Sequence, residues 1–126
     1  MKVGIKKFED IEVWQKAIQL YYKINLICEG NSLKRDFSAK DQISRATLSI
    51  SNNIAEGFEY DNTGDLIRFL KYAKGSSGEV RSMLCAFELS GKINKEEASV
   101  LKAELEEISK NLKGFISCLT EYKQTK

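Results

Sequence analysis

The sequence contains no histidine and no proline, and each absence excludes particular structures. Without histidine, the Ser-His and Cys-His pairs of nucleophilic catalysis and the Glu-x-x-His motif of di-iron bundles cannot form. Without proline, no helix is broken by a residue that lacks a backbone N–H. Glycine and asparagine must therefore mark the turns.

Sequence motifs for nucleotide binding, membrane spans and metal sites are also missing. The segment "GSSG" lies inside a helical pattern and does not form a Walker-type phosphate loop, and no run of about 18 apolar residues occurs. The three cysteines, Cys28, Cys85 and Cys118, have no metal-ligand spacing and lie in apolar helical patterns, so we expect buried, reduced thiols. We expect a cytoplasmic protein that is not an enzyme, with no cofactor, metal, membrane contact or small-molecule substrate.

The composition is that of an ordinary globular domain. The 126 residues are enough to form one domain around a single core. Lys and Arg number 20 against 18 Asp and Glu, which gives a formal net charge of +2. This balance is far from that of a dedicated nucleic-acid binder.

Capping residues divide the chain into four periodic segments. Asp10 can cap the first segment, and the second opens at Ser38. Asn62 or Thr63 can cap the third, and Gly91 can end it.

Asn94 followed by Glu97 resembles a capping box and begins the fourth segment. We predict helices over about 10–29, 38–58, 63–90 and 95–122. Short connections favour antiparallel neighbours, so we predict an all-α fold, an antiparallel up-down-up-down four-helix bundle that fills residues 1–126 as one domain.

The first predicted helix has an apolar arc that is too wide for one bundle core. A monomer would expose part of this arc, and contiguous exposed apolar surface usually marks an interface. We therefore assign Val13 and Leu20 to an interface between copies of the chain. The alternative is a monomer in which this helix is deeply buried. The arc contains two stripes, Ile11, Trp14, Ile18 and Tyr21 beside Val13, Ala17, Leu20, Ile24 and Ile27.

The second and third predicted helices each carry a polar stripe opposite their apolar face. Arg45 and Glu56 are 11 residues apart, and so are Arg68 and Glu79. Residues that face each other in an antiparallel hairpin have a constant sum of residue numbers. The equal spacings therefore predict that Arg45 meets Glu79 and that Glu56 meets Arg68.

Small residues occupy the middle of both stripes. The same register places Ser49 opposite Gly75, which would let the backbones approach closely and explain helical glycines that cost about 1 kcal/mol each relative to alanine. The alternative is a solvated stripe in which the glycines mark a kink. We assign the stripe a role in register or in an interface; its residues are Arg45, Ser49, Asn53, Glu56, Arg68, Gly75, Ser76 and Glu79.

Three segments of the sequence resemble a known family. They are "FEDIEVWQKAIQLYYKI", "QISRATLSISNNIAEGF" and "LIRFLKYAKGSSGEVRSML". Together they look like the bacterial four-helix bundle proteins encoded in intervening sequences of 23S rRNA genes. The resemblance implies a four-helix bundle that assembles into a barrel-shaped homopentamer. It also implies kinship with the accessory variability determinant proteins of diversity-generating retroelements, which are pentameric and bind nucleic acid.

The resemblance assigns no catalytic residue, and two function classes follow from it. The first is an oligomer that binds RNA or DNA through basic residues, with Lys34 and Arg35 as our first choices because Glu59 and Asp61 make the hairpin turn acidic. The second is an oligomeric scaffold or partner-binding module with no nucleic-acid role. The candidate phosphate contacts are Lys2, Lys6, Lys7, Lys34, Arg35, Lys40, Lys71 and Lys74.

Overall fold

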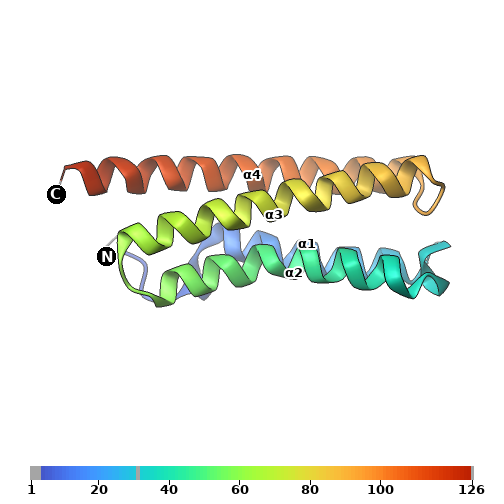
Figure 1. Ribbon diagram of the computed structural model, residues 1–126, viewed down its shortest axis with the longest axis horizontal. Coiled ribbons are helices and arrows are strands. Elements are labelled where there is room, and N and C mark those ends of the chain that lie inside the picture. Colours follow the sequence, from blue (N-terminus) through green and yellow to red (C-terminus); the bar gives the residue numbers. More distant parts are fainter. Residues whose placement is uncertain (1–3, 31, 126) are drawn as a thin grey trace.

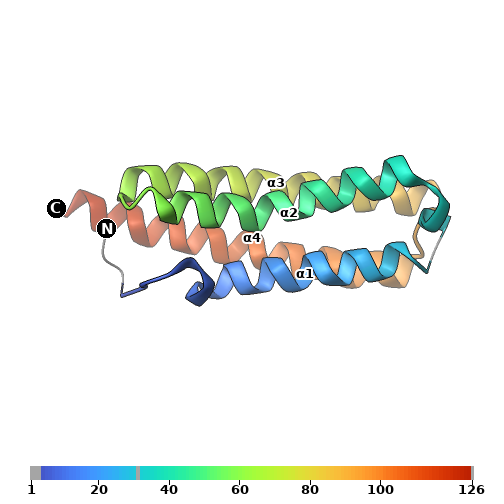
Figure 2. The same ribbon diagram turned by 90° about the horizontal axis from the view of Figure 1, so that it is seen from below.

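A computed structural model describes residues 4–30 and 32–125 of the chain and confirms the all-α architecture. The four long helices run alternately up and down, so both chain ends and the α2–α3 turn lie at one end of the molecule (Figure 1). Helix α1 packs against α4 as well as α2, which closes the bundle (Figure 2). The elements are η1 (Phe8–Asp10), α1 (Glu12–Cys28), η2 (Ser32–Arg35), α2 (Phe37–Glu59), α3 (Thr63–Leu89) and α4 (Lys95–Gln124).

The third and fourth helices begin as predicted. The Asn62 side chain accepts a hydrogen bond from the Asp65 N–H, and the Asn94 side chain accepts one from the Glu97 N–H. Each satisfies a backbone donor that has no partner within the first turn of its helix. Just after α3, Gly91 has a φ of 77°, in the left-handed region where glycine carries no steric penalty.

The predicted starts of the first two helices are wrong. Asp10 belongs to the 3₁₀ turn η1, and α1 is preceded by Ile11, which makes no side-chain cap. Helix α2 is capped by Asp36, whose Oδ1 accepts a hydrogen bond from the Ala39 N–H, so Ser38 already lies within the helix. The Asp36 carboxylate also binds Lys92 in the α3–α4 connection.

The core is formed by one apolar stripe from each helix. Among the described residues, three buried polar side chains, Thr47, Ser51 and Ser77, accompany these apolar residues. The apolar faces predicted opposite the polar stripes of α2 and α3 are buried in the core. The largest fully buried side chains include Leu20, Ile24, Ile43, Ile50, Ile54, Leu66, Leu70, Leu84, Leu101, Leu105 and Ile108.

The cysteine prediction is correct for one residue and wrong for two. Cys28 is buried at the end of α1, and burial raises the pKa of its thiol. Cys85 and Cys118 are exposed, because each lies on the outer side of its helix, next to the apolar stripe and not in it. All three are free thiols. None of the helices within residues 4–30 and 32–125 is long and apolar enough to cross a membrane.

Candidate nucleic-acid interface

Ser49 and Asn53, in the middle of the polar stripe of α2, lie at the contact with α3. Ser49 Oγ and Ser76 Oγ lie 3.0 Å apart across the two helices. Asn53 Nδ2 donates to both the carbonyl oxygen and the Oγ of Ser49, at 2.8 and 3.0 Å. These bonds explain why the interior of α2 contains serine and asparagine. At the half-buried contact with α3, each of these polar side chains finds a hydrogen-bond partner. Ser76, one residue beyond the predicted Gly75, makes the contact.

The predicted ion pair at one end of this stripe is not formed. Arg45 and Glu79 line the same surface groove, together with Met83. Arg45 Nε nevertheless binds Asp41 Oδ2 at 2.8 Å, on its own helix. A carboxylate four residues away on the same helix face is within reach without ordering a second long side chain.

The predicted pair at the other end is replaced in the same way. Arg68 binds Asp65 Oδ1 at 2.9 Å, three residues back on α3, and this contact raises the pKa of Arg68 and lowers that of Asp65. Glu56 accepts a hydrogen bond of 3.4 Å from the Tyr60 hydroxyl. Within the described part of the chain, no ion pair joins Glu56 to Arg68.

Helices α2 and α3 approach closely at Gly57, and no such approach occurs at Gly75. A Cβ atom at Gly57 would lie 2.6 Å from Phe69 Cβ and 3.4 Å from Leu66 Cα, so the site accepts only glycine. A Cβ atom at Gly75 or Gly78 would meet nothing within 4 Å. The prediction that Gly75 permits close backbone packing within the hairpin is therefore wrong, because Gly75 points away from α2.

The predicted basic residues lie at separate places on the bundle. Lys6 and Lys7 precede η1 at the end that carries both chain termini, and Lys34 and Arg35 lie in η2 at the opposite end (Figure 2). All four side chains are exposed. Lys2 lies outside the described residues.

Lys40 is already engaged within the protomer. Its Nζ lies 3.3 Å from Glu29 Oε2 and 5.2 Å from the centre of the Phe37 ring. A phosphate would have to displace the Glu29 carboxylate, so Lys40 is a weaker candidate than the exposed lysines.

Lys71 and Lys74, on α3, lie beside a part of α4 that also carries lysines. Three contacts between these helices share one antiparallel register: Arg81 with Glu106, Cys85 with Lys102 and Gly64 with Lys123. In that register Lys74 lies opposite Lys113. Lys71 and Lys110 lie one turn away in opposite directions along the bundle, and Lys110 also lines a crevice with Glu12 and Val13. We call these four residues, Lys71, Lys74, Lys110 and Lys113, the lysine face.

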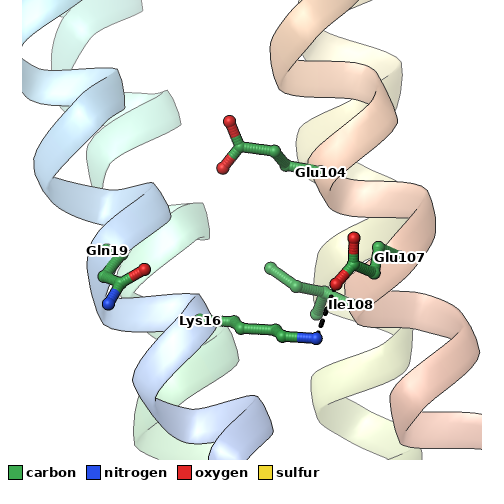
Figure 3. Close-up of a pocket in the computed structure, with 5 residues that line it drawn as sticks. All are labelled: Lys16, Gln19, Glu104, Glu107 and Ile108. Atoms are coloured by element: carbon green, nitrogen blue, oxygen red, sulfur yellow. Dashed lines mark hydrogen bonds and ion pairs between the residues drawn. The ribbon is translucent and has the colours of Figure 1, made fainter.

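The carboxylates of α4 that precede this face have partners on other helices. Lys16 Nζ binds Glu107 Oε2 at 2.5 Å and also donates to Asn111 Oδ1 at 2.9 Å. Lys23 binds Glu104 at 3.1 Å. Figure 3 shows Lys16 reaching from α1 to Glu107 across the crevice between α1 and α4, with Glu104 and Gln19 on its walls.

Within residues 4–30 and 32–125, the lysine face itself forms no ion pair, although Lys110 lines a crevice that also contains Glu12 of α1. Glu106, one turn before Lys110, lies 3.9 Å from Arg81. Among the described residues, no carboxylate lies within ion-pair distance of Lys71, Lys74, Lys110 or Lys113. Sequence reasoning missed Lys110 and Lys113, because the alternation of Lys and Glu along α4 looks like an ordinary solvated face. What separates these two lysines from an ordinary solvated face is that the nearby glutamates of α4 form ion pairs with residues of other helices.

Comparison with known proteins identifies the family. The model of the 23S rRNA-intervening sequence protein family matches residues 9–114. The chain belongs to this family. Among solved structures, it is similar to a protein of unknown function from the S23 ribosomal protein family of Bacteroides thetaiotaomicron, with a TM-score of 0.74 and 23% identity. That match covers 82% of this chain and 97% of the other, and it supports the fold. No curated protein matches the sequence.

In this member of the 23S rRNA-intervening sequence protein family, the predicted interface residues of α1 are core residues. Val13 is 5% exposed and Leu20 is fully buried. Their assignment to an interface between copies is wrong, because this stripe faces the core, where α1 packs against α2 and α4. Every residue of the predicted arc is buried or half-buried. Outside the arc, Tyr22 and Leu26 are 65% and 56% exposed on the outer side of α1.

Proposed function

We propose that this family member is a homo-oligomer that binds nucleic acid through the lysine face and acts by binding, without catalysis. The observation that carries the proposal is the group of four neighbouring lysines with no carboxylate partner. Lysine ammonium groups on a rigid surface attract phosphates and release the counterions condensed on them.

Assembly would multiply a weak attraction. The exposed Tyr22 and Leu26 of α1 support an interface between copies, since aromatic and apolar residues are enriched at the centres of such interfaces. The family resemblance implies five copies. Five chains at +2 each would carry 5 × 2 = +10 and would repeat the lysine face around the assembly.

The test measures binding of the purified, intact protein to labelled nucleic acid over a range of salt concentrations. We expect log affinity to fall with log salt at a slope of about 0.7 to 0.9 per phosphate contacted. The double variant Lys74→Glu and Lys113→Glu should abolish binding at moderate salt. The variant Lys34→Glu and Arg35→Glu, with the same change in charge, is the matched control and should retain most of the affinity. A flat titration of the wild-type protein at low salt would exclude the proposal.

An oligomeric scaffold that binds a protein partner is the second candidate. The mixed charges of the α2–α3 stripe and the exposed Tyr22 and Leu26 favour it, because such a surface suits a protein better than a uniformly charged phosphate backbone. A scaffold would assemble normally and would show no affinity for RNA or DNA. The charge-reversal variants would then behave like the wild type.

A further inference from the structure

An aromatic cluster with two exposed rings lies beside the α2–α3 turn. The Tyr60 ring stacks on Phe69 at a centroid distance of 5.3 Å, and the Tyr72 ring packs edge-on against Phe69 at 5.4 Å. Phe69 is buried, whereas Tyr60 and Tyr72 are each about half exposed. Because both tyrosine rings pack on a buried ring, less rotamer freedom is lost when a ligand covers their exposed surface.

Tyr60 has acidic surroundings. Its neighbours in the chain are Glu59 and Asp61, and both side chains are exposed. Its hydroxyl donates a hydrogen bond of 3.4 Å to Glu56. A phosphate brought close to this ring would be repelled by these carboxylates, so Tyr60 is the less favourable of the two rings for a nucleotide.

Tyr72 lies next to cations instead. The Arg68 guanidinium carbon is 5.9 Å from the centre of the Tyr72 ring and 4.6 Å from that of Phe69. Asp65, 2.9 Å from Arg68 on the same helix, holds the guanidinium in place. Lys71 directly precedes Tyr72 and forms no ion pair within the described part of the chain. Tyr72 is therefore the exposed ring at which a base and its phosphate both find favourable partners.

The helix geometry suits one nucleotide. Consecutive Cα atoms are about 3.8 Å apart and their side chains are about 100° apart around a helix. The Lys71 ammonium and the Tyr72 ring can therefore contact the phosphate and the base of the same nucleotide. Gly75 lies one turn further, between the directions of these two side chains, and a Cβ atom there would meet nothing within 4 Å. No side chain at this position crowds a base beside Tyr72.

We infer that the lysine face binds a single-stranded nucleic acid, with an unpaired base stacked on Tyr72; this inference rests on the proposed function and names its ligand class. Proteins that hold single strands combine a basic surface with aromatic rings on which the bases stack. A duplex keeps its bases stacked on one another and is held mainly through its phosphates and groove shape. It offers no free base to Tyr72.

The charges along α3 set the direction of the strand. Glu79 lies two turns beyond Tyr72, in a groove between α2 and α3, and would repel phosphates on that side. Lys74 lies towards α4, opposite Lys113, and further from the acidic α2–α3 turn than Lys71 is. A strand that starts at Tyr72 and crosses α3 towards α4 therefore leaves the carboxylates behind and places its next phosphates at these lysines.

The test compares three labelled probes of about 15 nucleotides with the intact wild-type protein: a single strand, the duplex of the same sequence, and an abasic strand that keeps the phosphates and lacks the bases. We expect the single strand to bind at least about fivefold more tightly than the other two. Equal or tighter binding of the duplex or of the abasic strand would overturn the inference and leave the proposed function standing. Failure of every probe to bind would overturn both.

Variants locate the stacked base. Tyr72→Ala should weaken binding of the single strand at least about fivefold and leave binding of the abasic strand unchanged, whereas Tyr72→Phe keeps the ring and should retain most of the affinity. Tyr22→Ala, which removes an exposed tyrosine of α1, is the matched control and should bind like the wild type. Circular dichroism reports the fold of each variant. Unchanged affinity of Tyr72→Ala for the single strand, or an equal loss for the abasic strand, would contradict the inference.

Discussion

The hydroxyl oxygens of Ser49 and Ser76 lie 3.0 Å apart across the contact between α2 and α3. Asn53 donates a further hydrogen bond to the Ser49 hydroxyl, so three polar side chains form one chain of bonds between the two helices. The contact favours this register of the hairpin, because a shift of α3 by one residue would separate the Ser76 hydroxyl from that of Ser49.

Replacing Ser49 by alanine should lower the free energy of unfolding by about 1 kcal/mol, since Ser76 and Asn53 both lose a partner. The Ser76→Ala variant should lose a similar amount. The double variant should lose less than the sum, because both changes break the same bond. Chemical denaturation measures the three values. Ser82→Ala, on the exposed side of α3, is the control and should stay within about 0.5 kcal/mol of the wild type.

The glycines of α2 and α3 should respond to alanine in opposite directions. Gly57→Ala should destabilise the protein by about 1 to 3 kcal/mol, because its Cβ would overlap Phe69. Gly75→Ala should stabilise the monomer by about 0.5 to 1 kcal/mol, since the site is open and helical. Thermal denaturation compares the two variants. Equal destabilisation would show that Gly75 is packed against something other than its own chain.

Substitutions on the two sides of α1 should separate folding from assembly. Leu20→Ala should lower the free energy of unfolding by about 2 to 5 kcal/mol, because Leu20 is fully buried in the protomer. Leu26→Asp should instead dissociate the oligomer and leave the protomer helical, because Leu26 is on the outer side. Light scattering gives the mass, and circular dichroism gives the helix content. A wild-type particle of 14.3 kDa at every concentration would contradict the proposed assembly.

The Lys16–Glu107 contact should make stability fall in acid. The hydrogen bond from Lys16 lowers the pKa of Glu107 from its ordinary value of 4.5. A carboxylate whose pKa is lower in the folded state stabilises the fold above its unfolded pKa and loses this effect as the pH falls through the folded pKa. The deficit of Glu107→Gln relative to the wild type should therefore be complete at pH 7 and shrink below about pH 4.5.

A matched control for this pH experiment is Glu106→Gln, on the same helix. Glu106 lies 3.9 Å from Arg81 across α3 and α4, at the outer limit of ion-pair distance. Its replacement should change the free energy of unfolding at pH 7 less than Glu107→Gln does. Denaturant titrations of both variants between pH 3 and pH 7 make the comparison. A constant deficit for Glu107→Gln over this range would show that its carboxylate contributes only through packing.

The four helices and most of their buried faces could be predicted from the sequence. Apolar residues recur at helical spacing in every segment, and caps such as Asn62 and Asn94 act within three residues of their position. These signals are local, so they can be recognised without knowing which other helices pack nearby. The wrong cap at Ser38 has a different cause: Asp36 and Ser38 are both of a residue type that caps helices well, and propensity alone does not choose between them.

Electrostatic partners could not be predicted in this way. Arg45 and Arg68 have carboxylates available both on their own helix and across the hairpin, and the sequence contains no measure of which is nearer. The same limit hid the lysine face. Its lysines lack ion-pair partners partly because Arg81, Lys16 and Lys23, on other helices, form ion pairs with the glutamates of α4.

The sequence by itself therefore determined the helices, their order and the apolar stripe that each contributes, because hydrophobic periodicity and capping operate within a few residues. Only the tertiary structure decided which stripe of α1 enters the core, and which lysines remain without an acidic neighbour. Both depend on the rotation of each helix about its axis. That rotation is fixed by the packing of all four helices together, and the position of any one side chain relative to another helix follows from it.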